Sequence, residues 1–190
     1  MSAQVVREIA AAAFKDAIDM LAIIEVLEAG NAPDAVASSR SNRTEQVVKC
    51  ISRALWTRLV VIVTRAYATN PRPGDRHAQY AFDLLKDPAV RLELETMGSD
   101  LSTLDEAVAV WAKCRDDHRR QLIHDFRDKQ VAHWGIQDHP SPVIDNIFAV
   151  TKATATALER LAQGTGVVGL SVDSQLGVYR DAANRFWRAR

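Results

Sequence analysis

One short stretch of the chain concentrates the residue types that could cleave a phosphodiester bond. It reads HDFRDKQVAHWG and runs from His124 to Gly135. Five residues separate Arg127 from His133, and Asp128 follows the arginine directly. A histidine can take the proton of a ribose 2′-hydroxyl or give one to the leaving 5′-oxygen, while an arginine can hold the charge that develops on the phosphorane. With a carboxylate to orient these groups, the set predicts cleavage of RNA without a metal.

The spacing of Arg127 and His133 sets a geometric condition. In an α-helix each residue turns by about 100°, so positions six apart differ by about 120° and do not point at one phosphate. Either the helix unwinds near Ala132, as Gly135 suggests, or a second subunit contributes. A purely structural interpretation is also open, because cations are favoured at the negative end of a helix and Trp134 could cap the core.

The balance of charges limits the classes of function. The chain has 190 residues with 24 Lys and Arg against 24 Asp and Glu, so its formal net charge is zero. Such a balance argues against a protein that coats long nucleic acids, but it permits a small basic site. Cys50 and Cys114 lie far apart behind an N-terminus unlike a signal peptide, which favours free thiols in the cytoplasm. The most apolar run, Leu59 to Val63, is too short for a membrane span.

The elements that must position these residues are predicted to be helices. Apolar residues recur with a period of about 3.6 along most of the chain, and glycines, prolines and capping residues interrupt the stripes. A connection is expected at 31–42, Asn42 with Glu45 suits a capping box, and Asp87 suits a cap before a helix that begins at Pro88. The expected helices run from near the N-terminus to Gly30 and then over 43–69, 75–86, 87–98, 102–126 and 144–164.

These stripes predict an all-α protein with four or more helices in an antiparallel bundle, because each helix must bury its apolar face against another. The bundle is expected to span 1–163. Residues 164–190 are expected to form a C-terminal turn and a short basic tail of the same domain. A single domain also suits the length of the chain.

Three further patterns resemble functional motifs but have a simpler structural interpretation. GTGVVG at 164–169 matches the dinucleotide-binding pattern G-x-G-x-x-G, but it follows a predicted helix instead of a strand, so we expect a helix stop and no cofactor. Cys114 and His118 offer two of the four ligands that structural zinc takes, and no second pair completes the set, so no metal is expected. The arginines of 179–190 could clamp RNA, but the aromatic residues between them are expected to dock on the body.

The sequence FRDKQVAHWG, 126–135, resembles the R-x(4 to 6)-H signature of the HEPN superfamily. Its R-D-K-x-x-A-H form is similar to the branch named for abortive phage infection. Arg65 in VTRAYA resembles an Arg-x-aromatic-Asp element on an earlier helix of that branch, although Ala68 stands where the family carries the acid. The resemblance covers 45–162 loosely and ten residues tightly.

The resemblance implies an all-helical bundle and, in many members, metal-independent endoribonuclease activity. Arg127 would steady the scissile phosphate, His133 would transfer protons or contact the phosphate, and Asp128 would orient the arginine. Lys129 and Arg65 would contact the RNA. Some members are phage-defence components or toxins bound by antitoxins, and others are non-catalytic scaffolds or partner-binding modules, so that second class of function stays open.

The resemblance also implies a twofold dimer that brings two motifs into one cleft. One copy of Arg127 and His133 offers few groups for acid, base and charge stabilisation, and pairing would double the set. We therefore expect a homodimer, seen by light scattering as a species near twice the chain mass of 21.0 kDa. A monomer at micromolar concentration that still cleaved RNA would show that one chain holds a complete site.

Overall fold

The computed structural model describes residues 2–41, 43–69, 77–132 and 143–188, and the side chains of 130–132 lie outside this description. All regular structure within these ranges is helical, and no strand occurs there, which confirms the predicted all-α class. The elements are α1 (Ser2–Gly30), α2 (Pro33–Ser41), α3 (Glu45–Ala66), α4 (Ala78–Leu84), α5 (Pro88–Thr96), α6 (Leu101–Arg115), α7 (His118–Phe126), the π-helix η1 (Arg127–Ala132), α8 (Ile144–Gly164) and α9 (Asp173–Arg188).

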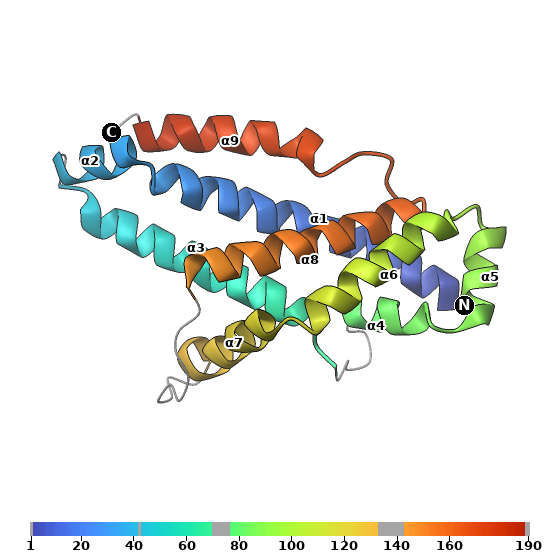
Figure 1. Ribbon diagram of the computed structural model, residues 1–190. Helices are drawn as coiled ribbons and strands as arrows, with labels where there is room; N and C mark the ends of the chain where they lie inside the picture. The colour runs from blue at the N-terminus through green and yellow to red at the C-terminus, as the bar shows by residue number, and fades with distance from the viewer. Residues whose placement is uncertain (1, 42, 70–76, 133–142, 189–190) are drawn as a thin grey trace.

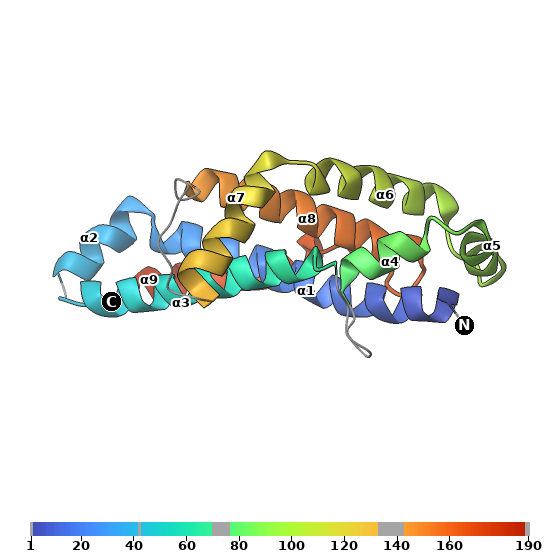
Figure 2. The same cartoon turned by 90° about the horizontal axis from the view of Figure 1, so that it is seen from below.

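The long helices lie side by side in a bundle with α1 near its middle (Figure 1). α1 contacts α3, α8 and α9, and α8 in turn contacts α6. The pairs α1/α3, α1/α8 and α6/α8 run antiparallel, as predicted, while α9 runs parallel to α1 (Figure 1; Figure 2 shows the bundle from below). Lys152 in the first half of α8 pairs with Glu28 near the end of α1 at 3.1 Å.

Small and large side chains together close the centre of the bundle. α1 buries several alanines beside fully buried Met20 and Ile24. The alanines let neighbouring backbones approach, while each large apolar side chain contributes roughly 1.5 to 3 kcal/mol on burial. The end of α8 lies very close to α6, because a Cβ on Gly164 would lie 2.9 Å from the backbone nitrogen of Leu104. The glycine that the sequence predicts as a helix stop is therefore also needed for helix packing.

The expected connection at 31–42 contains the short helix α2, which the apolar period did not reveal. Pro33 opens this helix and Asp34 lies in its first turn, both of which favour a helix N-terminus. Only Ala35 and Ser39 are buried along it, so its stripe is too weak to see in the sequence. Asn42 and Asp75, the expected caps of the following helices, lie outside the described residues, and the N-caps of α3 and α4 are instead Thr44 and His77.

The expected helix over 102–126 is two helices. α6 ends at Arg115, and the Asp117 carboxylate caps a new helix by accepting a hydrogen bond from the backbone nitrogen of Arg119 at 2.8 Å. Asp87 caps α5 in the same way, accepting from the backbone nitrogen of Ala89 at 2.9 Å, as predicted. The break was missed because the apolar period continues through it.

The C-terminal segment is a helix of 16 residues, α9, and not a short tail after a turn. It buries Leu176, Ala183 and Trp187 against the body. The Trp187 indole nitrogen donates to the carbonyl of Val26 at 3.0 Å, and Arg180 binds Glu25 at 2.6 and 2.8 Å. The tail therefore docks one of its aromatic residues, as expected, but Arg180 and Arg188 also form ion pairs, with Glu25 and Asp34.

Gly30 makes room for Trp187, and this contact gives a test of how α9 is held. A Cβ at position 30 would lie 2.8 Å from the indole, whereas a Cβ on Gly177 of α9 meets nothing within 4 Å. We expect Gly30→Ala to lower the free energy of unfolding by about 1 to 3 kcal/mol through overpacking. Gly177→Ala should raise it by about 0.5 to 1 kcal/mol, because alanine favours a helix. Urea denaturation followed by circular dichroism measures both, and equal changes in the two variants would contradict the packing of Trp187 on Gly30.

Candidate functional site

The RNA-cleaving motif begins where α7 changes into the π-helix η1. Arg127 is the C-cap of α7 and the first residue of η1, and Asp128 and Lys129 follow it there. A π-helix closes hydrogen bonds from i to i+5, and such turns are frequent at functional sites. The 100° turn of an α-helix therefore does not apply across Arg127–Ala132. His133 lies outside the described residues, so its position relative to Arg127 stays a prediction.

Asp128 lies between an arginine and a histidine. Its Oδ1 is 3.0 Å from Nε of Arg127, and its Oδ2 is 3.4 Å from Nδ1 of His124. Nε of Arg127 is buried and makes no hydrogen bond with any described residue, so this contact is an ion pair without hydrogen-bond alignment. All three side chains are about one-third exposed, at 35%, 38% and 37% for Arg127, Asp128 and His124. Asp128 thus contacts the arginine that it is predicted to orient.

His124 is the member of this cluster that sequence reasoning missed. It stands four residues before Asp128, and positions four apart share one face of a helix. That spacing was the available signal. The result is a partly exposed cluster of one guanidinium, one carboxylate and one imidazole, which we call the His124–Arg127–Asp128 cluster.

The two predicted RNA contacts lie in different surroundings. Lys129 is half-buried on η1 and already interacts with another group. Arg65, in the last turn of α3, binds both carboxylate oxygens of Asp16 of α1 at 2.7 Å. Phe126 of α7 shares a hollow with Trp56 of α3, and Arg65 lies nine residues beyond Trp56, roughly 13 Å further along that helix. The structure therefore does not bring Arg65 to the cluster.

This hollow adjoins the cluster through Phe126. Its volume is about 960 Å³. We call it the α2–α3 hollow, and it is lined by Gly30, Asn31, Val36, Ser39, Arg40, Glu45, Val48, Lys49, Ser52, Arg53, Trp56, Thr57 and Phe126.

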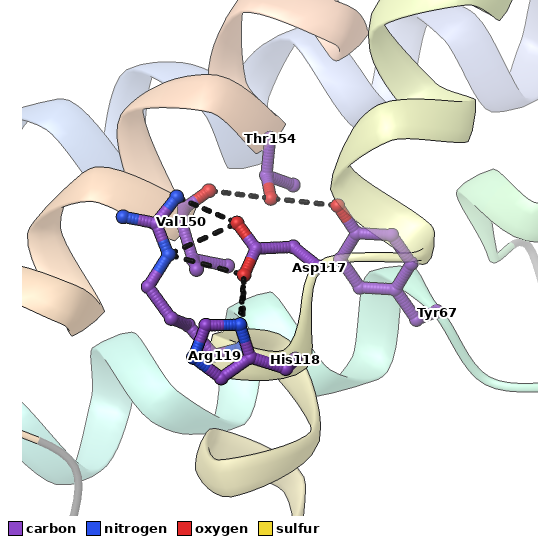
Figure 3. A network of polar contacts seen from close by, with 6 residues as sticks. All are labelled: Tyr67, Asp117, His118, Arg119, Val150 and Thr154. Carbon is purple, nitrogen blue, oxygen red and sulfur yellow. Dashed lines mark hydrogen bonds and ion pairs between the residues drawn. The ribbon is translucent and has the colours of Figure 1, made fainter.

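The junction between α6 and α7 sets the direction in which α7 runs along α3. Figure 3 shows the polar contacts of this junction. Besides capping α7, Asp117 accepts from Nε and Nη2 of Arg119, at 3.0 and 2.6 Å. Nδ1 of His118 lies 3.7 Å from the same carboxylate. The hydrogen bond from Arg119 is the main reason that the pKa of Asp117 lies below its ordinary value. The first turn of α7 is therefore held by one ionised carboxylate.

An aromatic stack fixes the same junction from the other side. Tyr67 follows α3 and stacks on Trp111 of α6 at 4.2 Å, and the Arg120 guanidinium of α7 lies 5.3 Å from the centre of the Tyr67 ring. The Tyr67 hydroxyl hydrogen-bonds Thr154 of α8 at 2.8 Å (Figure 3). Burial raises the pKa of Tyr67 well above its ordinary value, so this hydroxyl stays neutral. Four helices thus meet around one ring.

Cys114 and His118 do not form a shared face, because α6 ends between them. Cys114 is buried, and burial raises the pKa of its thiol, whereas the His118 side chain is 85% exposed. No group of three or more His, Cys, Asp or Glu side chains suited to a metal ion occurs in the part of the chain that is described.

Comparison with known proteins adds no relative to this picture. No family model, curated protein or solved structure matches the chain. None of the helices within the described ranges is long and apolar enough to cross a membrane.

The contribution of the Asp117 N-cap to stability can be tested by comparison with a variant of the adjacent Asp116. Asp117→Ala should lower the free energy of unfolding by about 0.5 to 2 kcal/mol at neutral pH, because α7 loses its N-cap. Asp116→Ala is the matched control, since that carboxylate is 68% exposed and pairs with the adjacent Arg115. We expect this control to change stability by less than about 0.5 kcal/mol.

The same comparison has a defined pH dependence. The folded pKa of Asp117 is lower than its ordinary value of 3.8, so its contribution is present above that pH and is lost as the pH falls through the folded pKa. The difference between wild type and Asp117→Ala in chemical denaturation should therefore shrink in strong acid. A difference that stayed constant into strong acid would mean that the charge of Asp117 does not hold α7.

Proposed function

We propose that this chain is a metal-independent endoribonuclease of the HEPN type. The observation that supports it is the His124–Arg127–Asp128 cluster, which is partly exposed where α7 meets the π-helix η1 and lies a few residues before His133 in the chain. An arginine, an orienting carboxylate and two histidines within ten residues supply the groups that transfer protons and stabilise charge in phosphodiester cleavage.

The proposed reaction uses the substrate's own nucleophile. The 2′-hydroxyl oxygen attacks the adjacent phosphorus and loses its proton to one histidine. The bond from phosphorus to the 5′-oxygen breaks, and a second protonated group gives the leaving oxygen its proton. The products are a 2′,3′-cyclic phosphate and a 5′-hydroxyl. Arg127 stabilises the charge on the phosphorane oxygens, while Asp128 holds the guanidinium in place.

His124 enlarges the set of groups that one chain can offer. His133 alone could act as base or as acid, whereas His133 with His124 could provide both roles in one turnover. The carboxylate of Asp128, 3.4 Å from Nδ1 of His124, would fix the orientation of that ring. We assign His124 to the second proton transfer.

The resemblance also suggests a biological setting. We propose that the enzyme belongs to a phage-defence or toxin system of the cytoplasm and acts on cellular or phage RNA. An antitoxin or another partner protein would control it, and a homodimer is the proposed active form.

A second function is favoured by the outer surface of α9. Val178, Tyr179 and Phe186 are 74%, 42% and 42% exposed, and Tyr179 and Phe186 are seven residues apart on one face of the helix. Exposed apolar side chains that share a face are typical of protein-binding surfaces. The alternative proposal is therefore a non-catalytic scaffold or partner-binding module.

Cleavage assays separate the two proposals. Purified protein should cut single-stranded RNA in the presence of a chelator, leave the cyclic phosphate and 5′-hydroxyl ends, and spare DNA, which lacks the nucleophile. His133→Ala should lower the rate on the order of a hundredfold or more, and Arg127→Lys should also be poor because an ammonium lacks the guanidinium fork. His124→Ala should lower the rate and remove one limb of the pH–rate profile.

His118→Ala is the matched control, because this exposed histidine lies on the same helix but at its opposite end. It should keep wild-type activity. A folded wild-type protein that is inert toward transfer RNA and messenger RNA, with variants that change only stability, would favour the partner-binding module.

A further inference from the structure

The first half of α3 presents a polar and apolar stripe to the α2–α3 hollow. Positions 45, 48, 49, 52, 53, 56 and 57 line it, and residues three or four apart fall on one helix face. Most side chains of this half of α3 are exposed or half-buried, whereas Leu59, Val60, Ile62 and Val63 further along are buried. α3 therefore packs into the main core with its second half, while its first half lines the hollow.

Three cations border the hollow against one carboxylate. Arg40 comes from the last turn of α2, and Lys49 and Arg53 come from successive turns of α3. Lys49 pairs with Glu45 at 2.8 Å, which leaves two positive charges in excess. Arg53 makes no ion pair or hydrogen bond with any described residue. Cations four apart on a helix repel one another, and a bound anion would relieve that repulsion.

Aromatic side chains form part of the wall between these cations and the His124–Arg127–Asp128 cluster. Trp56 and Phe126 are half-buried and both line the hollow. Phe148 of α8 stacks on Trp56 at 5.3 Å and 13°, which holds the indole in place. Trp56 and Phe126 thus contribute aromatic surface to the hollow that the positive charges also border.

We propose that the α2–α3 hollow binds a nucleotide, with its base against Trp56 and Phe126 and its phosphate near Lys49 and Arg53. Aromatic stacking beside a cationic groove is how proteins hold unpaired nucleotides, and it tolerates different bases because every base has a flat face. The hollow has room for a nucleotide, since ligand sites of about 300 to 1,000 Å³ hold small molecules. This binding does not depend on the proposed cleavage.

The nucleotide could be one unit of a single strand or a free mononucleotide. An acidic polypeptide would satisfy the cations but would leave the aromatic wall without a flat partner. The direct chain connection from Phe126 to Arg127 favours a strand, because a nucleotide in the hollow would put a neighbouring phosphate on the side of the cluster.

A binding assay with an uncleavable strand tests the site apart from catalysis. The probe is a fluorescein-labelled single strand of 2′-O-methyl RNA, about ten nucleotides long, followed by fluorescence anisotropy. Methylation blocks the 2′-hydroxyl nucleophile, so Arg127→Lys, which should impair cleavage, should still bind this probe. Trp56→Ala should weaken binding roughly tenfold through loss of stacking. Arg53→Gln should weaken it several-fold and lower the slope of log Kd against log salt by about 0.7, as expected for one lost phosphate contact on a single strand.

Arg58→Gln is the matched control, because Arg58 lies on the same helix but pairs with Asp19 of α1 outside the hollow. It should bind the probe like the wild type. Adenosine monophosphate as a competitor identifies the source: displacement at comparable concentration assigns the site to free nucleotides, and weak displacement assigns it to strands. Three results would overturn the proposal. They are equal losses of probe affinity in Arg53→Gln and Arg58→Gln, no binding of either the labelled strand or adenosine monophosphate, and displacement of the labelled strand by polyglutamate as effectively as by adenosine monophosphate.

Discussion

Four acidic residues of α1 pair with cations of the neighbouring helices α3, α8 and α9. Asp16 pairs with Arg65 and Asp19 with Arg58, both on α3, while Glu25 pairs with Arg180 of α9 and Glu28 with Lys152 of α8. These are largely exposed ion pairs, each worth about 0 to 1 kcal/mol, so each pair contributes less than the burial of one leucine. Their effect is to fix the relative alignment of four helices. Burial of the apolar face of α1 supplies the stability that the alignment needs.

This arrangement explains where uncompensated positive charge remains. α3 runs antiparallel to α1, so the pairs at Arg65 and Arg58 use the acids of the first two-thirds of α1. Glu28 and Glu25, nearer the end of α1, pair instead with α8 and α9. Arg53 therefore meets no acidic partner among the described residues and faces the hollow instead. A chain with no net charge thus still carries a local basic surface, as its sequence permitted.

Local signals in the sequence were sufficient for most of the fold but not for the site. The apolar period gave the long helices, and Asp87 with Pro88 gave the start of α5, because a cap depends on a few adjacent residues. The break at Asp117 was also local, but an uninterrupted apolar period concealed it. The pairing of Arg65 with Asp16 could not be foreseen, since it joins residues 49 apart through the packing of two helices. His124 could have been found from its spacing to Asp128, whereas the π-helix that carries Arg127 had no clear signature.

The charges of the His124–Arg127–Asp128 cluster suggest that attraction of the substrate and catalysis use different surfaces. Asp128 neutralises the guanidinium that would bind the scissile phosphate, so the cluster alone has little net attraction for an anion when His124 is neutral. A carboxylate that orients an arginine therefore weakens long-range binding of the strand. The excess cations of the α2–α3 hollow could restore that attraction from the side, where they do not compete with Arg127 for Asp128. Substrate affinity and chemistry would then reside on neighbouring surfaces that α7 connects, so the direction in which Asp117 starts that helix matters to both.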